Sequence, residues 1–435
     1  MPVHYEKEDT NMWLKRGVWL YVFLLIFEGA LRKWALPGIA GPLLIVRDPL
    51  ALWLIYTVWN NNQFPKSMLM QSVLWIGGVS ILTAVLFGHR NIYVALFGAR
   101  IFLIYFPLIF VIGQILNRDD VIRIGRFFVV ISIPMAILIG LQFYSPQSAW
   151  VNRGIGGDIE GSGFSGALGY FRPAATFSFT NGTYLFFGTT ASFLLYFWLN
   201  PNAINKFVLS FATIALITAI PLSISRSLTF HVVVVILFAL IPVFKKPSML
   251  IRVFVGGISF FLILSVLSNV EFFSTATTAF SHRFETAGTS EGGLEGTIGD
   301  RYIGGLFSAL EMSVEQPFFG YGVGMGTNVG SQLISGKVNY LISEGEWGRL
   351  IGEMGPFMGI SIIIIRLLLS WKFFMTSLNK MLGGDLLPWM VLSSALLILP
   401  QGQWAQPTSL GFSALICGLV VASLKNKIIV QPKGN

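Results

Sequence analysis

Apolar runs long enough to cross a bilayer follow one another along almost the whole chain. A hydrocarbon core about 30 Å thick needs roughly 20 apolar residues in a helix, and short polar segments separate runs of this length. The pattern predicts about twelve transmembrane helices, at residues 17–35, 40–60, 69–88, 93–116, 122–144, 174–198, 206–223, 227–244, 250–268, 350–371, 386–401 and 407–424. The expected fold class is therefore all-α, in a polytopic membrane protein.

Two regions break this rhythm. Residues 145–172 are rich in glycine and show no helical period, so we expect a loop that is flexible or wrapped around something. Residues 269–349 are too long for a simple connection and predict a subdomain over one membrane face. Within it, apolar residues recur at helical spacing from Tyr302 to Val314 and stop before Pro317, which predicts a short amphipathic helix. The expected units are a first transmembrane group at 1–268, the loop subdomain at 269–349 and the C-terminal transmembrane helices at 350–435.

Composition excludes a soluble globular protein. Of the 435 residues, 54% are hydrophobic and 11% are charged, and the mean hydropathy is +0.71, which leaves too little polar surface to cover such a protein. The net charge of +9 is spread over short loops, which indicates membrane topology and argues against a nucleic-acid partner. Lysines concentrate in alternate connections, so we expect both termini in the cytoplasm, the segments 145–172 and 269–349 in the periplasm, and the first apolar run retained as an anchor.

The predicted outer loops contain arginine where the positive-inside rule expects few cations. Beyond residue 140 these loops and their edges hold one lysine, Lys337, and six arginines: Arg153, Arg172, Arg226, Arg283, Arg301 and Arg349. Guanidinium groups bind phosphate in a bidentate way, so the pattern indicates a fixed anion on the outer side. For Arg153 and Arg283, contact with solvent or lipid headgroups is the favoured alternative. Arg226 begins an apolar span, where an isolated charge costs several kcal/mol, and this favours a functional role.

Four short motifs occur in the order known from one enzyme superfamily. They are Arg172-Pro173, Ser225-Arg226-Ser227, Asp300-Arg301 followed by Gln316-Pro317-Phe318-Phe319-Gly320-Tyr321-Gly322, and Glu353-Met354-Gly355. In order and in predicted side of the membrane, the chain resembles the O-antigen ligase and O-antigen polymerase superfamily over roughly residues 90–425.

The resemblance implies an inverting, metal-independent glycosyltransferase of the GT-C type. Its donor would be a glycan on undecaprenyl diphosphate, and it would need no nucleotide sugar and no cofactor. The sequence has no outer Asp-x-Asp motif and no Walker loop, and its four histidines and one cysteine show no metal-ligand spacing. Arg172, Arg226 and Arg301 match family positions and are the expected clamp for the leaving diphosphate.

The resemblance also locates a candidate general base. Ligases of the superfamily carry a His-Asn pair about nine residues before the Glu-x-Gly sequence. This chain has Glu344-Gly345-Glu346-Trp347 there, so Glu344 aligns with the family histidine and Glu346 is the second candidate. A carboxylate can serve as the base if apolar surroundings raise its pKa.

Five further residues are candidate substrate contacts. Arg32, Arg47 and Arg100 fall in the outer halves of predicted spans, where they either pair with other charges to lock helices or extend the substrate site. Arg349 lies close to the candidate base. Trp347 could stack on a sugar, although an interfacial aromatic belt is the favoured alternative.

The expected function is polymerisation of a surface polysaccharide at the periplasmic face of the bacterial inner membrane. The missing histidine favours a polymerase over an O-antigen ligase that delivers glycan to lipid A core. The alternative from another class is a flippase for lipid-linked oligosaccharide, which would place charges near the midplane and show internal repeats. The expected partners are the lipid-linked glycan, the bilayer, and a chain-length regulator or flippase of the same pathway.

Overall fold

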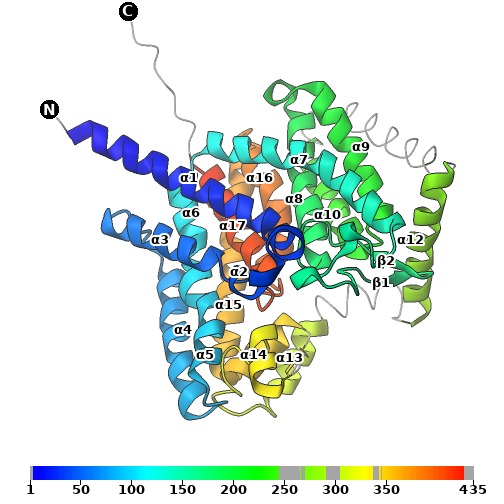
Figure 1. Cartoon of the computed structure of the whole chain (residues 1–435). Helices are drawn as coiled ribbons and strands as arrows, with labels where there is room; N and C mark the ends of the chain where they lie inside the picture. The colour runs from blue at the N-terminus through cyan, green and yellow to red at the C-terminus, as the bar shows by residue number, and fades with distance from the viewer. Residues whose placement is uncertain are drawn as a thin grey trace, which may run out of the picture.

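The computed structural model describes residues 3–243, 265, 270–290, 304–336, 342–343 and 345–425 (Figure 1). The first half contains α1 (Val3–Ala30), η1 (Leu31–Ala35), η2 (Pro37–Ile39), α2 (Ala40–Leu43), α3 (Arg47–Asn60), α4 (Met68–Leu86), α5 (Ile92–Arg100), η3 (Ile101–Tyr105), α6 (Phe106–Ile115), α7 (Arg118–Tyr144), η4 (Trp150–Asn152), η5 (Ile155–Gly157), β1 (Phe164–Ala167), β2 (Tyr170–Arg172), α8 (Thr180–Leu199) and η6 (Pro201–Ala203). The second half contains α9 (Lys206–Leu222), α10 (Arg226–Val243), α12 (Glu271–Ser290), α13 (Gly305–Ser313), α14 (Asn328–Ser335), α15 (Glu346–Leu382), α16 (Leu387–Ile398) and α17 (Pro407–Ser423).

The described chain is mostly helical and has the helices of a membrane protein. Six helical segments are long and apolar enough to cross a bilayer: Pro37–Asn60, Met68–Leu86, Ile92–Ile115, Arg118–Tyr144, Arg226–Val243 and Glu346–Leu382. The shorter apolar helices α9, α16 and α17 pack among them. A helix occupies at least part of each expected span except 250–268, of which the structure describes only residue 265. The total of about twelve crossings stays a prediction.

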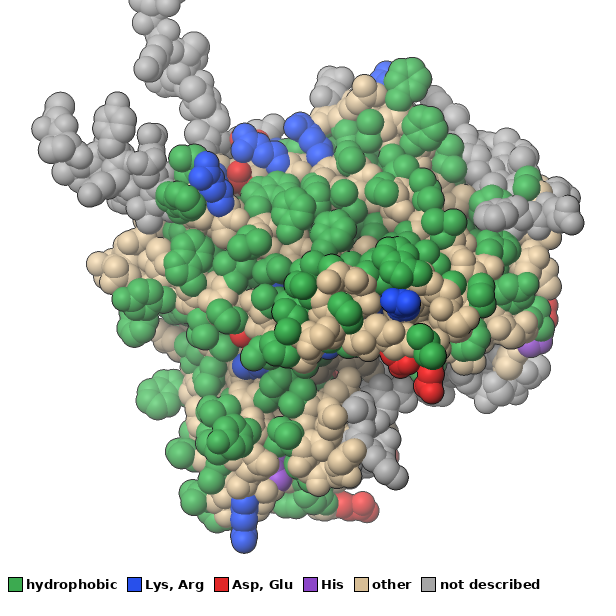
Figure 2. All heavy atoms as spheres, in the orientation of Figure 1, with side chains coloured by type: hydrophobic (Ala, Val, Ile, Leu, Met, Phe, Trp, Pro, Cys, Tyr) green, Lys and Arg blue, Asp and Glu red, His purple; other side chains and the backbone are tan. Residues whose placement is uncertain are grey.

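The surface of these helices is apolar. Large side chains such as Trp75 on α4 and Phe207 on α9, each 77% exposed, project outward. Figure 2 shows hydrophobic side chains over most of the visible face and only scattered charges. A surface of this kind suits contact with lipid chains.

Polar caps set several helix boundaries that hydropathy placed a few residues away. Asn117 and Asp120 form a reciprocal capping box, so α7 begins at Arg118 and not at the first apolar residue. The run expected at 174–198 becomes α8 only from Thr180. Pro173 starts an irregular stretch in which Ala175 has a φ of 51°, and this stretch cannot continue as helix.

Helix α15 is two helical arms folded back on each other. In a straight helix, Glu346 and Arg366, 20 positions apart, would be separated by about 30 Å. Arg366 Nη1 instead lies 2.7 Å from Glu346 Oε1. The reversal occurs at Gly355, with φ 76° and ψ 169°, a conformation open almost only to glycine, and Pro356 follows it. We call residues 346–354 the short arm and residues 356–382 the long arm.

The segment 145–172 is more ordered than its glycine content predicts. Strands β1 and β2 form an antiparallel hairpin that pairs Phe164 with Arg172. Leu168 and Gly169 turn the chain with φ values of 53° and 80°, as a tight hairpin requires. Buried Asn152 donates to the carbonyls of Gln142 and Ser145 and fixes the segment to the end of α7.

The long loop contains α12, α13 and α14. Helix α13 lies within the range where an amphipathic helix is predicted and packs on α15. After it, Gly320, Gly322 and Gly324 adopt positive φ. A Cβ on Gly324 would lie 2.2 Å from the carbonyl oxygen of Val94, so glycine permits this loop to sit directly on α5.

Candidate functional site

Three arginines from separate elements gather at the β1–β2 hairpin. Arg172 ends β2, and its guanidinium lies 4.6 Å from the ring centre of Phe164. Arg226 begins α10, where the Ser225 hydroxyl accepts a bond from the backbone of the first turn. Arg283 on α12 donates from Nη1 to the Gly166 carbonyl at 3.0 Å. We call Arg172, Arg226 and Arg283 the arginine cluster.

The charged form of Arg172 is destabilised by its surroundings in the cluster. It is half-buried, and its Nε is enclosed with no hydrogen-bond partner in the described part of the chain. Burial and, to a smaller extent, the positive charges of Arg283 and Arg226 together lower the pKa of Arg172 to about 10. The guanidinium is still charged at neutral pH. An anion placed here would accept a hydrogen bond from the unpaired Nε and would offset the repulsion between the arginines.

A second buried network joins the end of α1 to α3 and α17. Glu28 accepts from Arg47 Nε at 2.9 Å and from Arg32 Nη1 at 3.4 Å. Arg47 also donates to the Pro407 carbonyl at 2.9 Å, and Arg32 donates to Ser178 Oγ at 3.0 Å. One carboxylate thus faces two guanidinium groups, which leaves an excess of positive charge.

Lys33 connects η1 to the segment that follows β2. It is 1% exposed, and its Nζ donates to the Ala175 carbonyl at 2.6 Å. Ala175 follows Arg172 by three residues, so the segment between them links this network to the arginine cluster. The excess of guanidinium groups over carboxylates in the second network favours a bound anion nearby.

Arg100 belongs to a neutral pair. Its Nη1 donates to Asp48 Oδ2 at 2.6 Å, and the Tyr105 hydroxyl donates to Asp48 Oδ1 at the same distance. The guanidinium also stacks on the ring of Phe97 at 3.8 Å. These contacts join α3 to α5 and η3. Arg100 therefore pairs with another charge and locks helices together, which is one of the two possibilities raised by the sequence.

A third network holds the two arms of α15 together. Glu346 Oε1 accepts from Arg349 Nη2 at 2.9 Å and from Arg366 Nη1 at 2.7 Å, and its Oε2 accepts from Arg349 Nε and from the backbone of Trp404. Glu353 accepts from Arg349 Nη1 at 2.6 Å and from the Gly326 amide at 2.8 Å. We call Glu346, Arg349, Glu353 and Arg366 the α15 ion cluster. Two carboxylates balance two guanidinium groups in it.

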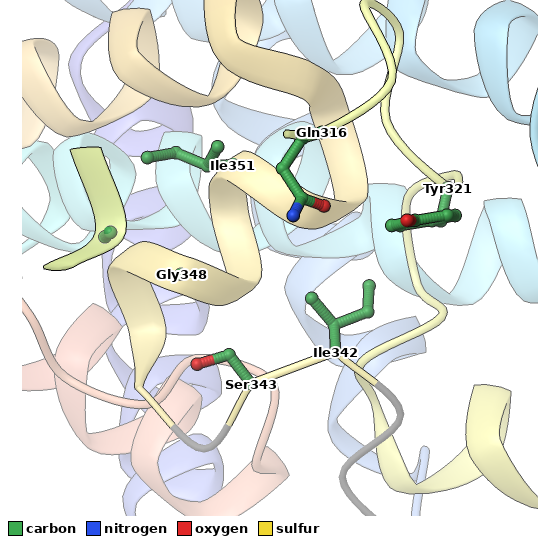
Figure 3. A pocket seen from close by; sticks show the side chains of 7 residues that line it. Gln316, Tyr321, Ile342, Ser343, Gly348 and Ile351 are labelled. Carbon is green, nitrogen blue, oxygen red and sulfur yellow. The ribbon is translucent and has the colours of Figure 1, made fainter. Parts of the chain in front are cut away.

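A cavity of about 240 Å³ lies beside this cluster (Figure 3). It opens between α13, the connection that follows α13 and the short arm of α15. Its described lining is uncharged and consists of Ala309, Gln316, Tyr321, Ile342, Ser343, Gly348 and Ile351.

The connection between α16 and α17 links the second and third networks. The Trp404 amide donates to Glu346, and the Pro407 carbonyl accepts from Arg47. Between them, Gln406 accepts from Asn181 at the start of α8. Residues 404–407 therefore couple α15 to α3 and α8.

The predicted site residues fall into several groups. Arg172 and Arg226 come together, with Arg283 beside them, whereas the sequence favoured headgroup contact for Arg283. Glu346 and Arg349 lie in the α15 ion cluster. Trp347 is 8% exposed and donates to the Pro400 carbonyl, so it packs inside the protein and not in an interfacial belt. Arg301 and Glu344 lie outside the described residues.

Sequence reasoning missed Arg366. It is fully buried, donates to the carbonyls of Leu399 and Gly402 as well as to Glu346, and lies 3.9 Å from the ring centre of Trp404. A charge inside the apolar run 350–371 was a sufficient signal, because an ionisable residue at such a depth needs a partner.

Comparison of the chain with family models, curated proteins and solved structures finds no match. Among the described residues, no group of His, Cys, Asp or Glu side chains has the geometry to hold a metal ion. The functional assignment therefore rests on the geometry above and on the motifs.

Proposed function

We propose that this protein is a membrane glycosyltransferase that moves a glycan from undecaprenyl diphosphate to the end of another lipid-linked repeat unit. The arginine cluster carries the proposal, because Arg172 is partly desolvated, repelled by two like charges and incompletely hydrogen-bonded. Preorganised guanidinium groups of this kind stabilise the negative charge that develops on a leaving diphosphate. The motif order and the apolar helices support the same assignment.

In the proposed reaction, an acceptor hydroxyl oxygen attacks the anomeric carbon of the donor glycan. The new carbon–oxygen bond forms on the face opposite the breaking bond to the diphosphate, so the configuration inverts. The hydroxyl proton passes to a carboxylate, and the electron pair of the broken bond stays on the diphosphate. Arg172, Arg226 and Arg301 bind that group.

The contacts of Glu346 favour Glu344 as the base. Both Glu346 oxygens accept bonds from guanidinium or backbone groups, and such contacts hold a carboxylate in place. Glu344 occupies the position that aligns with the family histidine. We therefore assign proton abstraction to Glu344 and positioning of the short arm to Glu346.

The folded-back α15 favours one second candidate, a flippase for the same lipid-linked glycans. Interrupted helices with buried charges also occur in transporters, where they form substrate sites near the bilayer midplane. An O-antigen ligase would use the same donor and the same reaction with a different acceptor, so the first proposal includes it as a variant.

The test uses the purified full chain in liposomes with lipid-linked repeat units. A polymerase yields a ladder of longer products, and a ligase yields product only when its separate acceptor is supplied. Movement of intact repeat units across the bilayer without a ladder would support the flippase instead.

Glu344→Gln and Glu346→Gln should fail in different ways. Glu344→Gln keeps the size of the side chain but cannot take the proton, so turnover should fall roughly 100-fold or more with donor binding and melting temperature unchanged. Glu346→Gln removes the charge between two buried guanidinium groups and should lower the melting temperature. Full activity in Glu344→Gln, with lost turnover and an unchanged melting temperature in Glu346→Gln, would reverse these roles, and full activity in both variants would mean that the hydroxyl is activated elsewhere.

We also propose an inner-membrane location with both termini in the cytoplasm and the site in the periplasm. The native Cys417 is fully buried, so single-cysteine probes can be added without removing it. A membrane-impermeant thiol reagent applied from the periplasmic side should label Gly296→Cys and spare Lys433→Cys. The opposite labelling pattern would show that the topology is inverted. The arginines would then lie on the cytoplasmic side, where cations are expected, and would no longer indicate an anion site.

A further inference from the structure

The cavity beside α15 differs chemically from the arginine cluster. Its described lining combines apolar walls from Ala309, Ile342 and Ile351 with the polar groups of Gln316, Tyr321 and Ser343, and it carries no charge. Figure 3 shows Gln316, Tyr321, Ile342 and Ser343 around the space in front of the short arm. A lining of this kind suits a ligand with an apolar face and hydroxyl edges.

One buried polar atom in the lining lacks a partner. Gln316 Oε1 is enclosed and accepts no hydrogen bond from any described residue. A buried carbonyl oxygen left unsatisfied is costly, which favours a ligand hydroxyl or water as its donor. Ser343 Oγ accepts from the Gly345 amide at 3.1 Å, so the Ser343 hydroxyl proton remains available to a ligand.

The neighbouring charges do not make this an anion site. Arg349 directs Nε and Nη2 to Glu346 and Nη1 to Glu353, and Arg366 directs its three nitrogens to Glu346 and two carbonyls. The α15 ion cluster is neutral as a whole. A phosphate or carboxylate entering the cavity would lose its hydration without gaining a cation from the described residues.

The volume is also limited. About 240 Å³ lies below the 300–1,000 Å³ of pockets for drug-sized ligands, so the space suits one sugar ring rather than an oligosaccharide. Ser343 immediately precedes the proposed base in the chain. The ring held here would therefore be the one whose hydroxyl is activated.

We propose that this cavity is a subsite for an uncharged monosaccharide ring at the accepting end of the glycan, with Gln316 accepting from one of its hydroxyl groups. The assignment of that ring as the acceptor rests on the proposed function. Gln316 and Tyr321 then become specificity-determining residues.

Kinetics give the first test. Gln316→Leu keeps the approximate size of the side chain and removes the acceptor oxygen, so the KM for the acceptor unit should rise about tenfold or more while donor binding is unchanged. Tyr321→Phe, which retains the ring, should change the KM less than Tyr321→Ala. The matched control is Gln332→Leu on α14, because Gln332 is exposed and outside the cavity lining.

Direct binding gives the second test, which does not require turnover. Saturation-transfer NMR on the detergent-solubilised full chain would compare the methyl glycosides of glucose, galactose and N-acetylglucosamine with methyl glucuronide. At least one neutral glycoside should give a signal that disappears in Gln316→Leu and persists in Gln332→Leu, and the glucuronide signal should be weaker.

The two proposals fail separately. Binding that depends on Gln316, in a protein that makes no ladder, would sink the polymerase and ligase assignment and keep the sugar subsite. A product ladder with an unchanged acceptor KM in Gln316→Leu, and no glycoside signal that depends on Gln316, would overturn the subsite. Stronger binding of the glucuronide than of every neutral glycoside would overturn it as well. If Gln316→Leu does not fold, loss of the signal in Ser343→Ala, with the fold retained, would support the subsite, and its persistence would count against it.

Discussion

Arg172→Ala should abolish glycan transfer while the protein stays folded in the membrane. Removing one charge-assisted donor to a developing anion costs about 3 kcal/mol, or roughly 100-fold or more in rate. Arg172→Lys should recover little, because an ammonium group does not reproduce the planar fork that grips phosphate. Arg226→Ala should cause a loss of the same order. Initial rates of product formation at saturating donor provide the measurement.

The pH dependence of donor binding offers an independent readout of the same residue. The pKa of Arg172 is lowered to about 10 in the free protein, and a bound diphosphate would raise it again. Binding should therefore be strongest below pH 10 and weaken as the pH rises through that value, and Arg172→Ala should lose this dependence. Arg153→Ala is the matched control, because Arg153 is exposed in the same loop. Wild-type rates in both Arg172→Ala and Arg226→Ala would end the clamp hypothesis.

Arg366→Met should destabilise the protein more than other single changes on the long arm. It would leave Arg349 as the one guanidinium partner of Glu346 in the α15 ion cluster and give that buried cluster a net negative charge. Breaking a buried ion pair by removing one partner costs about 3–5 kcal/mol. The short arm should detach from the long arm, so transfer should fall together with the melting temperature.

Charge balance gives the control for this prediction. In the double variant Arg366→Met with Glu346→Gln the cluster is neutral again, so part of the lost melting temperature should return. Lys372→Met, an exposed position on the long arm, should change little. A double variant no more stable than Arg366→Met would show that the pairing of these charges is not what holds the two arms together.

The positions of most helices were predictable, because hydropathy and capping govern them. Each apolar run outside 250–268 contains a helix in the described chain, because a backbone in lipid must satisfy its own hydrogen bonds. Boundaries moved where polar groups offered an alternative, as at the Asn117 and Asp120 capping box of α7. The β1–β2 hairpin was not foreseen. Its four-residue and three-residue strands are too short to show an alternating pattern, and its turn depends on local φ values.

The candidate site was predictable only in part. Arg172 and Arg226 were selected by their motifs, and the fold brings them together with Arg283, which lies on a helix of the long loop. The cavity could not be foreseen, since its lining comes from α13, the connection after it and the two sides of Gly345. Contacts among such distant segments have no signature in a single sequence.

The sequence by itself determined the class of the protein: apolar helices for a bilayer, arginines on the predicted outer side and two interruptions of the helical pattern. Tertiary structure alone decided which charges neutralise one another. The reversal at Gly355 brings Arg366 to Glu346 across 20 positions, so this candidate base contacts both arms of α15. The physical reason is that hydropathy and helix propensity act over a few neighbouring residues. The electrostatic free energy of a buried charge depends instead on every group that the fold places within a few ångströms of it.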